Sequence, residues 1–149
     1  MYAYVDHPVE SVCNCGRFLL WAMRGWGDAI EHSVCPLAAL SRGFAGACAL
    51  HVLPEFHLAL ALINKDGREP ISLAPMNCPH IVEHEAVLLA LWRDLSIGAF
   101  DNVKATLALL VAQTAVSPVS RAMTMVTAKL IAAGFDLSGL TPTPKKEIR

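Results

Sequence analysis

The sequence predicts an all-α protein that folds as a single-domain bundle of about five to six helices. Apolar residues recur at intervals of three and four along most of its 149 residues, which is the pattern of amphipathic helices. Residues that start or stop helices separate these runs: proline follows Cys35, Cys78 and Ser117, whereas Gly98 and Gly134 end two of the runs. Neither an internal repeat nor an internal linker interrupts the pattern, so the helices are expected to share one core.

The first two predicted helices have different starts. In the helix expected at 16–32 the apolar residues cover more than one stripe, and Arg24 is among the charged residues expected to keep one side in water. Cys35 and Pro36 open the second helix, because proline suits the first helical position and a small residue caps it. Cys48 lies between two alanines of this helix and is expected in the core.

The remaining elements follow from similar signals. A third helix is predicted at about 54–64, ending at an Asp-Gly turn. The segment 70–75, which begins and ends with proline, is expected to be short and extended. Helices are then predicted at 79–96, which a glycine stops, at 102–116, which an aspartate caps, and at 118–133, which opens on Ser-Pro. The chain thus divides into an N-terminal arm (1–15), one helical domain (16–140) and a flexible tail (141–149).

The composition predicts a partner surface. Hydrophobic residues make up 54% of the chain and charged residues only 17%, against about 25% in an average globular protein. Twelve Lys and Arg and thirteen Asp and Glu must therefore cover a whole domain, and large uncharged patches are expected on its surface. Because such patches mark partner surfaces, we expect a homodimeric binding or scaffold protein with an apolar interface, and a different protein partner stays an alternative.

The same composition disfavours other partners. A membrane span needs about 20 nearly uncharged residues, whereas the most apolar window, 43–63, contains Pro54, Glu55 and two histidines. The net charge of −1 gives no general attraction to nucleic acid. The first residues show neither the basic lead nor the apolar run of a secretion signal, and five cysteines are an odd number for a disulfide framework. A cytoplasmic protein with free thiols is therefore expected.

The clearest chemical signal is the run Cys-Pro-His-Ile-Val-Glu-His-Glu that starts at Cys78. With Pro79 at the first position of a helix, His80 and His84 would lie on one face of it. Two such imidazoles could hold a metal ion, with Cys78 or Glu83 completing the ligand set, and zinc or another transition metal would suit these donors. Alternatively, both rings are half-buried and hydrogen bonded to neighbouring carboxylates or backbone.

An enzyme is the less favoured interpretation of this run. The string from His80 to His84 also matches the signature of inverted zinc peptidases. A peptidase needs a third protein ligand and a groove for its substrate, and we expect neither in a small domain without a sheet. No Gly-rich phosphate loop or nucleophile elbow occurs in the sequence. Hydrolysis at the histidine site stays an alternative, and the sequence favours a protein without catalytic activity.

Three short patterns resemble those of a group of small uncharacterised helical bacterial proteins of unknown function. They are RFLLW at 17–21, CP at 78–79 and ExxLLxL at 85–91. The resemblance extends over about 16–115. It implies a helical fold and brings no activity, cofactor or site residue.

Overall fold

The computed structural model describes residues 8–9 and 12–140, and in this part of the chain it contains six α-helices and no β-strand. The all-α prediction is confirmed, while the tail 141–149 and most of the arm 1–15 lie outside the described residues. None of the described helices is long and apolar enough to cross a membrane. The elements are α1 (Asn14–Glu31), α2 (Pro36–Gly46), η2 (Leu50–Val52), α3 (Leu53–Asp66), α4 (Glu83–Ser96), α5 (Phe100–Leu110), α6 (Gln113–Ala132) and η3 (Leu137–Leu140).

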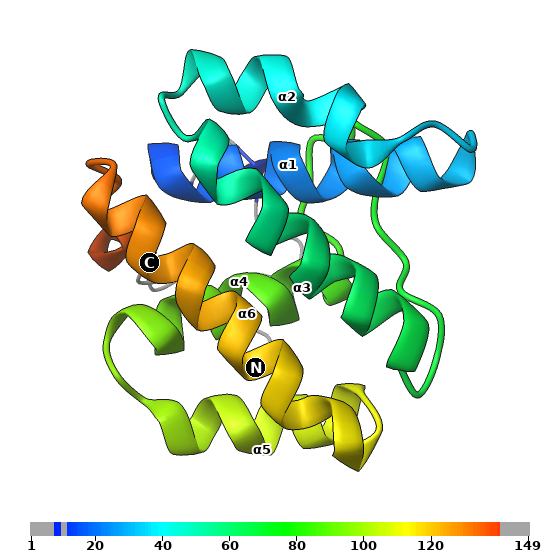
Figure 1. The fold of residues 1–149 in the computed structure, drawn as a ribbon, viewed down its shortest axis with the longest axis vertical. Coiled ribbons are helices and arrows are strands. Elements are labelled where there is room, and N and C mark those ends of the chain that lie inside the picture. Colours follow the sequence, from blue (N-terminus) through cyan, green and yellow to red (C-terminus); the bar gives the residue numbers. More distant parts are fainter. Residues whose placement is uncertain (1–7, 10–11, 141–149) are drawn as a thin grey trace, which may run out of the picture.

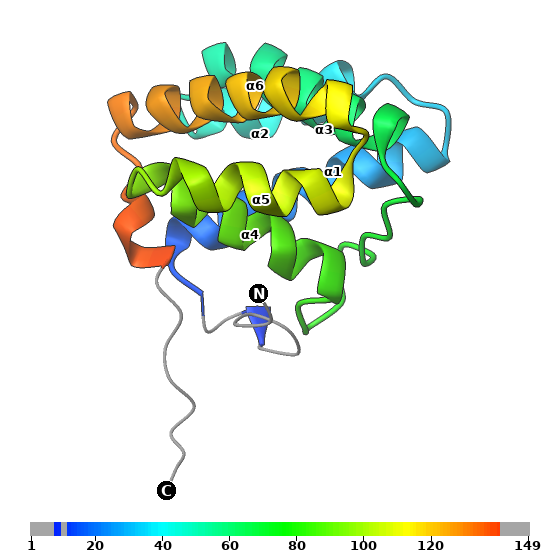
Figure 2. The ribbon, with the colours of Figure 1, turned by 90° about the horizontal axis from the view of Figure 1, so that it is seen from below.

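The helices form two layers. α3 and α6 run antiparallel and pack extensively against each other, with α2 beside α3 in the same layer (Figure 1). α1 and α4 lie in the second layer, and α5 runs along both α4 and α6 (Figure 2). The turn η3 packs on α1 and α4, where Leu137 and Leu140 are fully buried, and so closes one end of the bundle.

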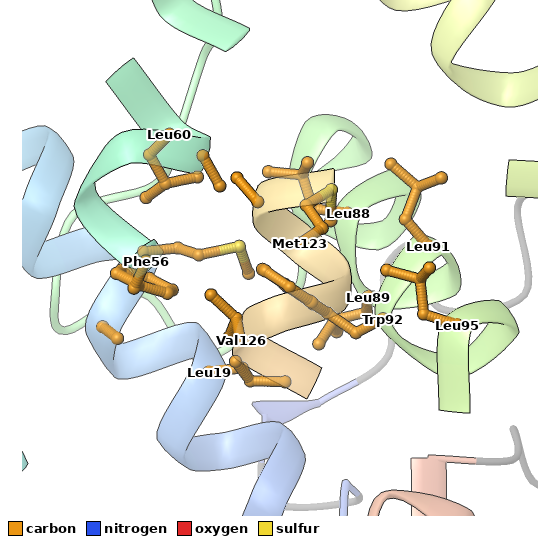
Figure 3. Packing of buried hydrophobic residues seen from close by; sticks show 14 of the residues in the cluster. Leu19, Phe56, Leu60, Leu88, Leu89, Leu91, Trp92, Leu95, Met123 and Val126 are labelled. Atoms are coloured by element: carbon orange, nitrogen blue, oxygen red, sulfur yellow. The ribbon is translucent and has the colours of Figure 1, made fainter. Parts of the chain in front are cut away.

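The core lies between the two layers and is built from leucine, valine, methionine and aromatic residues of every helix. Figure 3 shows its centre, where α3, α4 and α6 contribute large buried side chains. A chain of aromatic contacts crosses this region: Phe44 packs on Phe56 with ring centroids 5.5 Å apart, and Phe56 stacks on Trp92 at 6.3 Å. The 3.6-residue periodicity that predicted the helices thus recurs in most of their buried residues; the exceptions are Arg24, which is buried, and Cys48, which is exposed.

The first two helices differ from the prediction at their ends. α1 starts at Asn14 because the Cys13 sulfur accepts a hydrogen bond from the Gly16 N–H at 3.4 Å and caps the helix. α2 starts at Pro36 as predicted and ends at Gly46, so that Cys48 lies in the following turn with a φ of 58°. Cys48 is exposed, and its prediction as a core residue was wrong.

The predicted helices 102–116 and 118–133 are also displaced. α5 ends at Leu110 because its last backbone groups pair with the turn after α3: Arg68 N–H donates to Leu110 O at 2.8 Å and Ala112 N–H to Asp66 O at 2.9 Å. The chain is extended at Val111, and α6 starts at Gln113. Its Pro118 lies inside the helix on the exposed side, where water can satisfy the carbonyl that proline leaves without a donor.

The five cysteines are free thiols in very different environments. Burial raises the pKa of Cys15 to about 12, and the neighbouring thiol of Cys13 adds to the shift. Because only thiolates react readily, iodoacetamide at about pH 8 is expected to label the exposed Cys35 and Cys48 in the native protein and to leave Cys15 unmodified until guanidinium is added. Peptide mass spectrometry measures this order, and equal native labelling of Cys15 and Cys35 would contradict it.

Candidate functional site

A buried ion pair joins α1 and α4 within the second layer. The Arg24 side chain of α1 and the Glu85 side chain of α4 are 3% and 0% exposed. Their contact is bidentate, with Nε to Oε2 at 2.7 Å and Nη2 to Oε1 at 2.9 Å. The hydrogen bonds to Glu85 raise the pKa of Arg24 above its usual value, so the guanidinium stays charged in this site. Arg24 was expected on the solvent-exposed side of α1, and this prediction was wrong.

The pair also holds the irregular chain that precedes α4. Arg24 Nη1 donates to the carbonyl of Cys78 and Nη2 to that of His80, both at 2.8 Å. On the other side, Glu85 Oε2 accepts the N–H of Ala74 at 2.9 Å. Buried charges are tolerated only when their remaining hydrogen-bonding capacity is satisfied, and here the backbone of the segment supplies those bonds. We call Arg24 and Glu85 with these backbone partners the clamp.

The clamp explains why α4 starts at Glu83 and not at Pro79 as predicted. With the carbonyls of Cys78 and His80 bound to the guanidinium, the backbone stays extended, and Val82 (ψ 169°) caps the helix. Glu85 is the third residue of the helix and accepts the Val82 N–H at 3.1 Å, which completes half of a capping box. The prediction that His80 and His84 share one helical face was therefore wrong.

The two histidines have separate environments. His80 is exposed, and its backbone forms an isolated antiparallel bridge with Pro8. His84 is half-buried, and its Nδ1 accepts the N–H of Ser72 at 2.6 Å. The alternative that both rings are half-buried and hydrogen bonded therefore holds for His84 and is wrong for the exposed His80. Within the described part of the chain, no three His, Cys, Asp or Glu side chains are grouped so that they could hold a metal ion.

Two clefts lie along the extended segment 71–75. The first, which we call the α1 cleft, has a volume of about 530 Å³ and lies between this segment, the C-terminal half of α1 and Asn64 of α3. The second, the α4 cleft, has a volume of about 430 Å³ and lies at the start of α4. Three of the four predicted site residues, Cys78, Glu83 and His84, line the α4 cleft. His80 is not among its lining residues.

The α1 cleft has an acidic rim. Asp28 and Glu31 of α1 line it and are exposed, whereas the charge of Arg24 on its wall is neutralised by Glu85. His32 follows this turn, and its Nδ1 lies 2.9 Å from the Asp28 carbonyl and 3.3 Å from its carboxylate. These contacts, the backbone hydrogen bond first, raise the pKa of His32 above its usual value.

Sequence reasoning missed the clamp, although one signal for it exists. Arg24 follows Leu20 by four residues and therefore continues a buried line of α1. Glu85 is followed by an uncharged run, and the next charged residues in the sequence are Arg93 and Asp94. A lone cation and a lone anion on two apolar faces are candidates for a buried pair.

No family model, no curated protein and no solved structure matches this chain. The resemblance of the patterns at 17–21, 78–79 and 85–91 to small helical bacterial proteins therefore stays a prediction.

Proposed function

We propose that this protein is a homodimeric helical binding protein whose two copies meet through the outer surface of α3 and α6. The proposal depends on the exposed apolar side chains there: Leu50 and Leu58 are each 49% exposed and Met125 is 43% exposed. With the exposed Ala128 they form what we call the α3–α6 face. Large apolar residues exposed together on a surface poor in charge favour association.

The packing of the two helices supports this grouping. Lys129 Nζ of α6 lies 3.0 Å from Glu55 Oε1 of α3 and 3.4 Å from the carbonyl of His51, which follows Leu50. Leu58 lies one turn after Glu55 in α3, and Met125 lies one turn before Lys129 in α6. Because α3 and α6 are antiparallel (Figure 1), Leu58 and Met125 therefore lie on the same stretch of surface.

The size and charge of the surface suit a second copy. At 1.5 Å per residue α3 and α6 are about 21 and 30 Å long, and two helices about 10 Å apart present roughly 500 Å². α2, in the same layer, extends this to about 650 Å², comparable with the roughly 600–1,000 Å² per partner of specific interfaces. Within one turn of Leu58 and Met125 the ionic residues are Glu55, Arg121 and Lys129, and α2 adds the exposed Arg42. Their small net charge allows two copies to meet without strong repulsion.

Sedimentation velocity over about 1–100 μM tests the homodimer. We expect a dimer for the unaltered chain, and dissociation constants raised at least about 100-fold for Leu58→Lys and Met125→Lys, because each buries an unpaired ammonium at the interface. Leu109→Lys is the matched control, since Leu109 of α5 is 69% exposed and lies outside the α3–α6 face. A monomer throughout the concentration range, or equal dissociation of the control, would contradict the proposal.

A second candidate function is binding of a small ligand or metal ion in the α4 cleft, and hydrolysis there would depend on the same site. The observation that favours it is the presence of Cys78, Glu83 and His84 on the walls of one cleft. In the described structure these side chains are not grouped closely enough to share a metal ion, so a bound metal would have to draw them together. Protein purified without a His-tag should then carry zinc or another transition metal, and His84→Ala should lose it. Less than about a tenth of an equivalent in elemental analysis, together with no uptake of added Zn²⁺, would exclude the metal. Either function is proposed for the cytoplasm, which the composition favours.

A further inference from the structure

One edge of the segment 71–75 has no backbone partner among the residues that the structure describes. The N–H groups of Ser72 and Ala74 donate to the His84 and Glu85 side chains, so both point toward α4. In extended chain, backbone groups of successive residues point to opposite sides, and those of Ile71 and Leu73 therefore point away from α4. The N–H and C=O groups of these two residues make no hydrogen bond to any other described residue. Unpaired extended edges of this kind accept an added strand.

The edge is rigidly supported. His84 and the clamp bind the segment from the α4 side, and Leu73 packs against α1 at Gly27, where a Cβ atom would lie only 3.0 Å from Leu73 Cδ1. The segment is thus held in the extended form before any partner arrives, which reduces the ordering cost of binding.

The space next to the segment suits a peptide. The α1 cleft, which the whole of 71–75 lines, has a volume of about 530 Å³, within the range of about 300–1,000 Å³ that is usual for ligand sites. Pro70 and Pro75 bound the edge and offer no N–H, so a partner can pair with about three residues only.

The charge of the cleft selects the side chains of the partner. Because Glu85 neutralises Arg24, the ionic groups left on its walls are the carboxylates of Asp28 and Glu31. Both are exposed at the end of α1. The Asp28 carboxylate also lies 3.3 Å from the exposed His32 ring, so a cation of the partner would compete with His32 for Asp28. A lysine or arginine on the partner would complement these carboxylates.

We propose that the α1 cleft binds an extended peptide segment of another protein, which adds as a strand to Ile71–Leu73 and places a lysine or arginine against Asp28 and Glu31. This site is independent of the dimer surface, because its residues come from α1, the end of α3 and the segment before α4. The short edge predicts a modest affinity, with a dissociation constant below about 1 mM for a single peptide.

The probe is the peptide acetyl-Thr-Lys-Val-Lys-Thr-amide, titrated into the full ¹⁵N-labelled chain. We expect shifts of the Ile71 and Leu73 amides and of amides near Asp28 and Glu31. The double variant Asp28→Asn/Glu31→Gln should weaken binding about fivefold or more, because two exposed charge contacts are lost. Asp101→Asn, which removes an exposed carboxylate from α5, is the matched control and should bind like the unaltered chain.

Two methylated peptides separate strand addition from simple charge attraction. One carries an N-methyl group on the valine and the other on both lysines, so that each removes N–H groups from one peptide edge only. Strand addition predicts that one of them loses binding and the other keeps it. Equal binding of both methylated peptides and the parent, equal binding of a peptide with glutamate for lysine, or no amide shifts at about 5 mM parent peptide would overturn the proposal.

Discussion

Replacing Glu85 by alanine is expected to lower the free energy of unfolding by about 3–5 kcal/mol, because it leaves the Arg24 guanidinium buried without a counter-charge. Small domains have free energies of unfolding of about 5–15 kcal/mol, so a large part of the protein's stability would be lost. The substitution also removes the acceptor of the Ala74 and Val82 N–H groups. Denaturation with urea measures the loss, and a change of less than about 1 kcal/mol would contradict the role of the clamp.

The double variant Arg24→Met/Glu85→Met is the control for this prediction. Removing both charges avoids the unpaired ion, so we expect it to recover most of the stability that Glu85→Ala loses. It does not restore the hydrogen bonds to the segment before α4. Amide exchange at Ala74 and Val82 should therefore be faster in the double variant than in the unaltered chain, although both are folded. A double variant as unstable as Glu85→Ala would show that the charge balance is not the cause.

The helices could be predicted because their information is local. Cys35 and Pro36 open α2 as expected, and the recurrence of apolar residues identified every long helix and most of its buried residues. Leu19, Phe56 and Met123 lie in one core cluster although they are far apart in the sequence, because each belongs to the apolar stripe of its own helix. Such stripes require no knowledge of which helices are neighbours.

The start of α4 could not be predicted, because distant residues decide it. Pro79 is a suitable first residue for a helix, and only the approach of Arg24 from α1 draws the preceding carbonyls out of helical geometry. The same tertiary contact separates His80 from His84. The predicted metal site required His80 and His84 to belong to one helix. The contact between Arg24 and His80, which are more than 50 residues apart in the sequence, keeps His80 outside α4.

The ends of other helices were predicted wrongly for a similar reason. The end of α5 is set by hydrogen bonds from Arg68 and Ala112 across the turn that follows α3, and neither residue carries a local signal for this pairing. The two clefts are in turn consequences of the extended segment 71–75, whose proline-bounded character was visible in the sequence. The hydrogen bonds from this segment to His84 and Glu85 could not be predicted, because no local sequence pattern indicates which side chains an irregular segment will contact.

Trp92 is expected to be the most costly single truncation in the core. Its side chain is 0% exposed and stacks on Phe56 with an angle of 16° between the ring planes. Trp92→Ala would leave a large cavity between the layers and should lower the free energy of unfolding by about 3–5 kcal/mol. Thermal or urea denaturation measures this loss. A loss below about 1 kcal/mol would mean that the core collapses around the site or that Trp92 is not packed as described.

Trp92→Phe should cost far less, and the reason is specific to this site. Trp92 Nε1 is buried and has no hydrogen-bond acceptor among the described residues, so phenylalanine removes an unsatisfied donor whose burial costs about 1–3 kcal/mol. This gain offsets part of the lost packing, and we expect a net change within about 1 kcal/mol. Trp26→Phe is the matched control, because Trp26 Nε1 donates to His57 Nδ1 at 3.0 Å. It loses a hydrogen bond as well as packing and should be the more destabilising of the two; the reverse order would mean that the Trp92 N–H is satisfied.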